Sequence, residues 1–250
     1  MSHLEIERHA EVVTLALRRG KVNAIDEELI RELRAALDEL VVDRQARALI
    51  LTGRGPFFSF GLDVPAIYAL PEEACSRFLA DFTALYTRLY TYPKPIIAAV
   101  NGHAAGGGCM LALAGDRRIM AAGRARIGLN EIAFGASVFA GSVEMLAACV
   151  GQRRAETLLM SGALHDAAAA LDAGLVDRLV EPEALPEACL EEARGLAARQ
   201  PNAYAGLKRL LRGPVAERMR RREEDSIRDF VQIWYSAETR EALREIEIRD

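Results

Sequence analysis

Two short runs of apolar residues, separated by a segment with helical periodicity, constrain the fold of this chain most strongly. Residues 48–51 and 96–100 are apolar on both faces, so each run predicts a strand that is covered from both sides. Between them, residues 75–90 repeat large apolar side chains at helical spacing. Buried strands that alternate with amphipathic helices predict an α/β fold with helices packed on its sheets.

The flanking segments extend this pattern. Residues 4–17 alternate apolar and polar side chains and predict a pair of strands, and residues 27–41 predict a helix with Asp26 as its N-cap. The second half is mostly helical, with predicted helices over 143–150, 153–159, 167–173, 186–199 and 203–211 and a short strand over 175–180.

The C-terminal region predicts further helix with an interruption. Pro214 is expected to end the preceding helix, and the pattern beyond it is helical as far as Asp250. Large apolar side chains form a stripe there, at Ile227, Phe230, Val231 and Trp234. Such a stripe must be covered, either by the chain's own core or by another subunit, and the sequence leaves both open.

The charge balance argues against a nucleic-acid partner. The 250 residues include 32 Lys and Arg against 36 Asp and Glu, for a net charge of −4, whereas binding to a phosphate backbone needs a basic excess. The basic run at residues 218–222 is followed at once by three acidic residues, which is typical of a solvated helix face.

No membrane, export or metal signal is found in the sequence. The longest apolar stretch, residues 96–114, is broken by polar residues and glycines, and the N-terminus lacks the apolar region of an export signal. The four cysteines are far apart, and neither they nor the four histidines have metal-ligand spacing. We therefore expect reduced thiols, a cytoplasmic location, and neither a metal nor membrane association.

Two glycine-rich segments follow predicted strands. Residues 53–63 are rich in glycine and phenylalanine, and residues 101–114 place Gly106–Gly108 at the start of an apolar helix. Glycines allow a ligand to approach the backbone closely, and a helix start offers unpaired N–H groups, so an anion or oxyanion site is one interpretation. The alternative for both segments is tight packing of loop, helix and strand.

A third segment contains one acidic side chain among apolar neighbours. In residues 126–135, Glu131 follows a short predicted strand. A carboxyl group in apolar surroundings should have a raised pKa and could exchange protons near neutral pH. A loop or helix cap is the alternative role for this residue.

Nucleophilic catalysis is not supported. Residues 135–139 fail the G-x-S-x-G pattern at the last position, and no Ser and Asp are linked to His103, which we expect to be structural. Cys109 lies at a helix start, where a thiol pKa can be lowered, but it has no evident base or resolving partner.

Taken together, in this order and spacing, these segments resemble the enoyl-CoA hydratase/isomerase (crotonase) superfamily, closest to its Δ3,Δ2-enoyl-CoA isomerase branch. The resemblance covers nearly the whole chain and rests on Val22–Ile25, Phe58–Asp63, Pro93–Asp116, Gly128–Gly135 and Ser236–Ala242. It implies a spiral of ββα units over residues 1–200, which carries a CoA-thioester site. It also implies a helical region over residues 201–250 that assembles homotrimers, often paired into hexamers.

The resemblance further implies a set of site residues. The backbone N–H groups of Leu62 and Gly107 would hold the thioester oxygen when it becomes an enolate. The adenine and pantetheine path would be lined by Asn23, Ala24, Phe60, Asp63 and Ile67. No cofactor is implied, because CoA arrives as part of the substrate.

One departure from the family pattern decides the expected reaction. Hydratases of this family use two glutamates, of which the second matches Glu131, whereas the position of the first is occupied by Met110. Methionine cannot transfer a proton, but one carboxylate is sufficient to move a double bond from C3 to C2. We therefore expect an enoyl-CoA isomerase with Glu131 as its acid and base.

Several alternatives remain open from the sequence. On the same scaffold they are hydration, thioester hydrolysis, decarboxylation and retro-aldol cleavage, and Glu144 could supply a second carboxylate if residues 136–144 fold over the site. Its expected role is that of an ordinary helix residue. A protein that binds acyl-CoA without catalysis is an alternative of another class, and RNA binding by the arginine run is disfavoured by the net charge.

Overall fold

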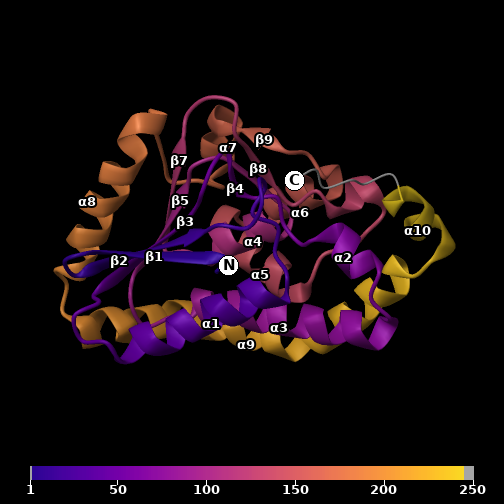
Figure 1. Cartoon of the computed structure of the whole chain (residues 1–250), viewed down its shortest axis with the longest axis horizontal. Coiled ribbons are helices and arrows are strands. Elements are labelled where there is room, and N and C mark those ends of the chain that lie inside the picture. Colours follow the sequence, from indigo (N-terminus) through magenta and orange to yellow (C-terminus); the bar gives the residue numbers. More distant parts are fainter. Residues whose placement is uncertain (1, 245–250) are drawn as a thin grey trace.

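Two β-sheets, connected strand by strand, form the centre of the fold, and helices surround them (Figure 1). The computed structural model describes residues 2–244. The larger sheet contains, in spatial order, β1 (Leu4–His9), β2 (Val12–Leu17), β3 (Ala48–Gly53), β5 (Ile96–Val100), β7 (Arg117–Ala121) and β10 (Arg178–Val180). The smaller sheet contains β4 (Phe57–Ser59), β6 (His103–Ala105), β8 (Arg126–Gly128) and β9 (His165–Asp166).

The chain alternates between the two sheets in a repeated ββα unit. The strands β3, β5 and β7 lie parallel in the larger sheet, and each is followed by a short strand, β4, β6 or β8, parallel to its neighbour in the smaller sheet. The helices that complete these units include α2 (Val64–Tyr68), α3 (Glu72–Tyr90), α4 (Gly107–Ala114) and α5 (Ala140–Val150). The predicted spiral of ββα units is confirmed, and the sheets are mainly parallel as expected for an α/β fold.

Both faces of the larger sheet are covered, as its all-apolar strands predict. Successive side chains of β3 point to opposite faces, so Leu49 and Leu51 enter the main core while Ala48 and Ile50 face the other side. That other side is covered by α8 (Leu185–Ala197), which lies apart from the other helices in Figure 1.

The predicted helices of the first half form, with small changes at their ends. The helix α1 (Glu27–Val42) begins as predicted at Asp26, whose Oδ1 accepts a hydrogen bond from the Leu29 amide at 2.8 Å. The helix α3 starts at Glu72, three residues before the predicted start. The strand β7 was not predicted, because its second residue, Arg118, is charged. Arg118 is nevertheless buried, since it forms an ion pair with Asp177 at 2.9 Å.

The second half is helical, as predicted. Its remaining elements are the 3₁₀ turn η1 (Glu131–Phe134), α6 (Gln152–Ser161), α7 (Ala167–Ala173), the 3₁₀ turn η2 (Pro182–Ala184), α9 (Pro201–Trp234) and α10 (Ala237–Leu243). Residues 245–250, the end of the predicted helical region, lie outside the described residues. No helix of residues 2–244 has both the length and the apolar character to cross a membrane.

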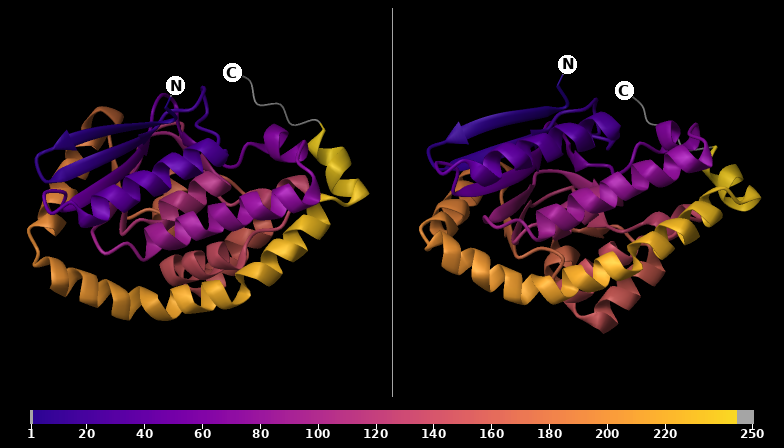
Figure 2. Two further views of the ribbon diagram at one scale, coloured as in Figure 1. Left: turned by 60° about the horizontal axis from the view of Figure 1, so that its bottom comes forward. Right: turned by 90° about the horizontal axis from the view of Figure 1, so that it is seen from below.

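The expected helix end at Pro214 is wrong, because α9 continues through this residue. Proline removes one backbone hydrogen bond, but α9 is fixed on both sides of it. Before Pro214, Lys208 forms an ion pair with Asp116 at 2.7 Å, and after it Met219 is fully buried. Figure 2 shows α9 as one long curved helix along the side of the molecule.

The apolar stripe of α9 packs on the chain's own core. Ile227, Phe230, Val231 and Trp234 are all buried in the main core, and α9 contacts both α3 and α5. The sequence left open whether the chain's own core or another subunit covers the stripe, and the structure shows that the chain's own core does. The arginines of residues 218–222 are solvated apart from their ion pairs, as predicted.

A buried asparagine connects the loop between β2 and α1 to the turn between β3 and β4. Asn23 has a positive φ of 50° and is fully buried. Its side-chain amide donates to the carbonyl oxygens of Arg54 and Phe57, each at 2.9 Å, and its Oδ1 accepts from the Arg19 amide at 3.0 Å. The Asn23 side chain thus supports the segment that leads into Phe60 and Leu62.

We predict that Asn23→Ala destabilises the protein by about 2–4 kcal/mol, because buried backbone groups lose their partners and alanine disfavours this backbone conformation. Urea denaturation of the variant and wild type measures the difference. Asn202→Ala, at an exposed position in the first turn of α9, serves as the control. A loss below about 0.5 kcal/mol at Asn23 would contradict the role assigned to this side chain.

Candidate active site

Three loops that follow the short strands of the smaller sheet meet at one cavity. Because β4, β6 and β8 are parallel neighbours, their carboxyl ends lie at the same edge of the sheet. The cavity has a volume of about 220 Å³. It is lined by Phe60, Gly61, Leu62, Val64, Gly106, Gly107, Asn130, Glu131, Phe134, Phe139, Phe230 and Trp234.

Two backbone amides lie close together at this cavity. A Cβ atom placed on Gly107 would be 3.3 Å from the Leu62 nitrogen, and one placed on Gly61 would be 3.0 Å from the Gly107 nitrogen. Within residues 2–244, neither the Leu62 nor the Gly107 amide donates a hydrogen bond to another group. Gly107 is also the first residue of α4, where the helix dipole is positive. The two N–H groups are therefore available to a ligand oxygen.

A glycine in a positive-φ conformation brings the amides and the carboxyl group together. Gly106 has a φ of +52°, and its amide donates to the carbonyl of Gly128 at 2.9 Å. A Cβ atom at this position would lie 3.2 Å from Oε1 of Glu131. Any larger residue would be strained in this backbone conformation and crowded by the carboxyl group.

Glu131 is a buried carboxyl group with little compensation for its charge. It begins η1 directly after β8, its exposed fraction is 6%, and its Oε2 has no hydrogen-bond partner among the described residues. Burial raises its pKa to about 7, and only its own backbone amide acts in the opposite direction. The raised pKa that the sequence predicted is thus confirmed, and Glu131 can exchange protons near neutral pH.

Three aromatic side chains, which we call the aromatic wall, close one side of the cavity. Phe139 precedes α5, and Phe230 and Trp234 come from α9. The Phe139 and Phe230 ring centroids are 4.8 Å apart, and those of Phe230 and Trp234 are 5.4 Å apart. The sequence showed Phe230 and Trp234 only as an apolar stripe, because their place at the site depends on how α9 packs.

The structure separates the remaining predicted binding residues into different places. Phe60 lines the cavity and is 43% exposed. Asp63 and Ile67 line a neighbouring cleft of about 460 Å³ between the start of α1 and α2. Asn23 and Ala24 are buried behind the loops and line neither space.

Neither of the two positions considered for a second acid supplies one to the cavity. Met110 is fully buried in the core on α4 and does not line the cavity. Glu144 lies on α5 and forms ion pairs with Arg218 at 2.8 Å and Arg222 at 3.5 Å. Among the described residues that line the cavity, Glu131 is the only ionisable one.

The nucleophile candidates have structural surroundings. Nδ1 of His103 accepts a hydrogen bond from the Arg126 amide at 3.3 Å, and its ring packs on Phe57. Burial and the nearby Glu131 raise the pKa of the Cys109 thiol, so the lowered pKa considered for a helix start is wrong. No group of three His, Cys, Asp or Glu side chains within residues 2–244 is arranged to hold a metal ion.

Comparison with known proteins identifies the family. A model of the enoyl-CoA hydratase/isomerase family matches residues 7–250. A putative enoyl-CoA hydratase of Thermus thermophilus is 41% identical over 197 residues, which cover 78% of this chain and 76% of that protein. Mouse mitochondrial enoyl-CoA delta isomerase 1 is 31% identical over 229 residues, which cover 91% and 79%.

A solved structure shows the same architecture. The crystal structure of human mitochondrial delta3-delta2-enoyl-CoA isomerase superimposes with a TM-score of 0.91 at 29% sequence identity, covering 97% of this chain and 95% of that one. The matches thus include proteins named for hydration and proteins named for isomerisation. They agree in the family, and this chain belongs to the enoyl-CoA hydratase/isomerase family.

Proposed function

We propose that the protein is an enoyl-CoA isomerase that moves a double bond from C3 to C2 of an acyl-CoA thioester. The thioester oxygen accepts hydrogen bonds from the Leu62 and Gly107 amides, and the Glu131 carboxylate removes a proton from C2. The electron pair of the C2–H bond delocalises into a dienolate, and Glu131 returns the proton at C4. The observation that carries the proposal is that Glu131 is the single ionisable group among the described residues that line the cavity.

The site is suited to this chemistry in two respects. Proton removal from C2 places negative charge on the thioester oxygen, and each preorganised donor in comparable oxyanion holes contributes about 3–4 kcal/mol to transition-state stabilisation. A base with a pKa of about 7 is partly ionised at neutral pH and can also act as the acid that returns the proton. The reaction needs no group beyond the chain and its acyl-CoA substrate.

Hydration is the second candidate, and the Thermus thermophilus relative named as a putative hydratase favours it. The family's hydratases use a second glutamate, and this chain has Met110 at that position, buried away from the cavity. There are two further kinds of alternative. One is another reaction of a thioester, namely hydrolysis, decarboxylation or retro-aldol cleavage, and the other is acyl-CoA binding without turnover.

We also propose that the chain forms a homotrimer, alone or as a dimer of trimers. An apolar cleft of about 610 Å³ is bordered by Ile132 of η1, Met160 and Ile233. Met160 is 71% exposed and Ile132 is 49% exposed, which is unfavourable for such large side chains unless a second copy covers them. Because Ile132 follows Glu131 directly, this contact would also support the catalytic loop.

Replacement of Glu131 tests its proposed role as acid and base. Glu131→Gln should lower the rate of 3-hexenoyl-CoA isomerisation by at least about a hundredfold, because the amide cannot take the proton. Formation of the conjugated 2-enoyl thioester is followed by its absorbance. Hydration of crotonyl-CoA by the wild type should be much slower than isomerisation. Fast hydration, or retention of more than a few per cent of the isomerase rate in the variant, contradicts the proposal.

The pH dependence follows from the raised pKa of Glu131. The kcat/KM of the wild type should rise with pH and level off above about 7, as the carboxyl group ionises. Because the folded pKa exceeds the unfolded value, this group binds more protons in the folded state, so its contribution to stability is lost as pH rises towards 7.

Denaturation at two pH values provides a second measurement of the raised pKa of Glu131. Between pH 5 and 8 the wild type should lose about 2–3 kcal/mol of stability that Glu131→Gln retains, on the basis of 1.36 kcal/mol for each pKa unit. Equal losses in wild type and variant would show that Glu131 titrates with an ordinary pKa.

The proposed trimer predicts a mass near three times the protomer mass of 27.4 kDa in sedimentation equilibrium, or near six times that mass if two trimers pair. Met160→Asp should shift the protein towards monomers, since a charge in an apolar interface is unfavourable. Leu171→Asp, at a position that is 42% exposed outside the cleft, is the control. A monomeric wild type, or an unchanged mass for Met160→Asp, would count against this interface.

A further inference from the structure

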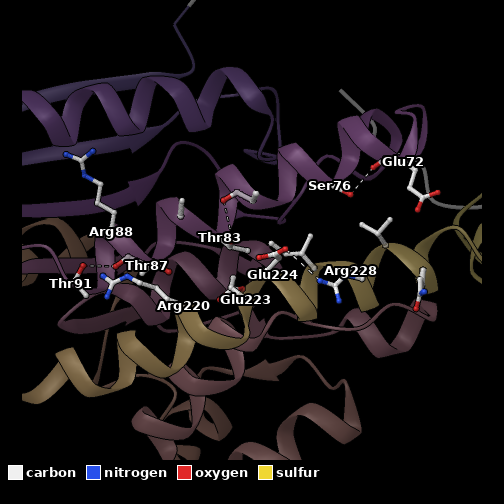
Figure 3. A pocket seen from close by; sticks show the side chains of 15 residues that line it. Glu72, Ser76, Thr83, Thr87, Arg88, Thr91, Arg220, Glu223, Glu224 and Arg228 are labelled. Carbon is white, nitrogen blue, oxygen red and sulfur yellow. Dashed lines mark hydrogen bonds and ion pairs between the residues drawn. The ribbon is translucent and has the colours of Figure 1, made fainter.

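A half-buried carboxyl group, which the sequence analysis did not identify, lies on the side of α9 that faces α3. The hydroxyl of Tyr86 on α3 donates to Oε1 of Glu223 at 2.5 Å, and Tyr86 is fully buried. Glu223 borders a groove of about 1020 Å³ between α3 and α9, where Figure 3 shows it beside Glu224 on α9. The bond therefore joins α3 to α9 at the edge of this groove.

The same turn of α9 is also fixed to the start of α5. A Cβ atom on Gly141 would lie 2.5 Å from the Tyr86 hydroxyl and 2.6 Å from Oε2 of Glu223, so this residue must be glycine. The Ala140 amide donates to Oγ of Ser226 at 3.0 Å. One turn of α9 thus contacts α3 and α5 at the same point.

This turn leads directly to the aromatic wall. Phe230 and Trp234 follow Glu223 by seven and eleven residues, so all three lie on one face of α9. On α3, the Tyr86 ring stands edge-on to Phe82 at 5.4 Å, and Phe82 packs on Phe139 at 6.4 Å between centroids. The hydrogen-bonded pair is therefore connected to the wall in two ways. Glu223 lies on the same helix face as Phe230 and Trp234, and Tyr86 reaches Phe139 through Phe82.

Tyr86 and Glu223 have limited access to water, so water cannot easily replace the hydrogen bond between them. Burial raises the pKa of both Glu223 and Tyr86, which shows that neither group has full access to water. A buried carboxyl or hydroxyl that loses its partner is strongly unfavourable, so removal of either group should displace α9 locally. Such a displacement would move Phe230 and Trp234 away from the cavity.

We propose that Tyr86 and Glu223 are positioning residues that hold the aromatic wall in place and so limit the length of the acyl group that the cavity accepts. This inference rests on the proposed function in that it takes the cavity as the acyl pocket. It does not depend on the reaction, because the length limit applies to binding as well as to turnover.

Binding of saturated acyl-CoAs tests the proposal. Trp234 is the only tryptophan of the chain, so its fluorescence reports on the wall itself. Butyryl-, hexanoyl- and decanoyl-CoA are titrated into the wild type, Tyr86→Phe, Glu223→Gln and the double variant. The matched control is Tyr90→Phe, one turn further along α3, where a buried tyrosine lacks contact with the wall.

We expect the wild type to prefer the short acyl groups. In Tyr86→Phe the ratio of decanoyl to butyryl affinity should rise by about tenfold, which is the scale on which apolar pockets distinguish chain lengths. Trp234 emission should shift to longer wavelength as water gains access. If the two residues act as a pair, the affinity ratio of the double variant should rise no further than that of the single variant with the larger effect. The control should match the wild type.

Unchanged ratios and unchanged Trp234 emission in folded Tyr86→Phe would overturn the positioning role and leave the isomerase proposal intact. Loss of affinity by the same factor for all three acyl groups would also overturn it, because that pattern indicates a general structural defect. If Tyr86→Phe does not fold, Ser226→Ala releases the same turn and should raise the ratio in the same direction. Absence of any acyl-CoA binding by the wild type would remove the proposed function as well.

Discussion

The burial of one carboxyl group is the constraint on which the rest of the site depends. Glu131 has an exposed fraction of 6%, and this burial places its pKa at about 7. The same burial disfavours the folded state whenever the group is ionised, so the surrounding structure must compensate. Gly106 leaves room for the carboxyl group, and the aromatic wall lines the cavity beside it. Stability is reduced at the position where the proposed proton transfer requires a base of intermediate strength.

Short strands bring the loops around the cavity together. Strands of only three residues, β4, β6 and β8, bring three distant loops to one edge because they pair in parallel. The larger sheet and its helices hold these strands in register, and α9 adds the aromatic wall from the C-terminal end of the chain. The chemistry therefore comes from the loops, while the position of each loop is determined by strand pairing and helix packing.

Local signals made much of this structure predictable, and long-range packing accounts for the remainder. The all-apolar strands, the Asp26 cap and the position of Glu131 among apolar neighbours follow from residue patterns within a few positions. The strand β7 was missed because its buried Arg118 is neutralised by Asp177, which is far away in sequence. The continuity of α9 through Pro214, the aromatic wall and the Tyr86–Glu223 bond all depend on contacts between distant segments, which periodicity does not report.

A labelled hydrogen at C2 of the substrate shows whether Glu131 carries the proton. A 3-enoyl-CoA deuterated at C2 is converted by the wild type in ordinary water, and the position of deuterium in the product is determined by NMR. Because only 6% of Glu131 is exposed, part of the deuterium that it removes from C2 should appear at C4 of the product. Loss to solvent of all the deuterium removed from C2, or transfer to C4 that persists in Glu131→Gln, would contradict a single buried carboxyl group as the proton carrier.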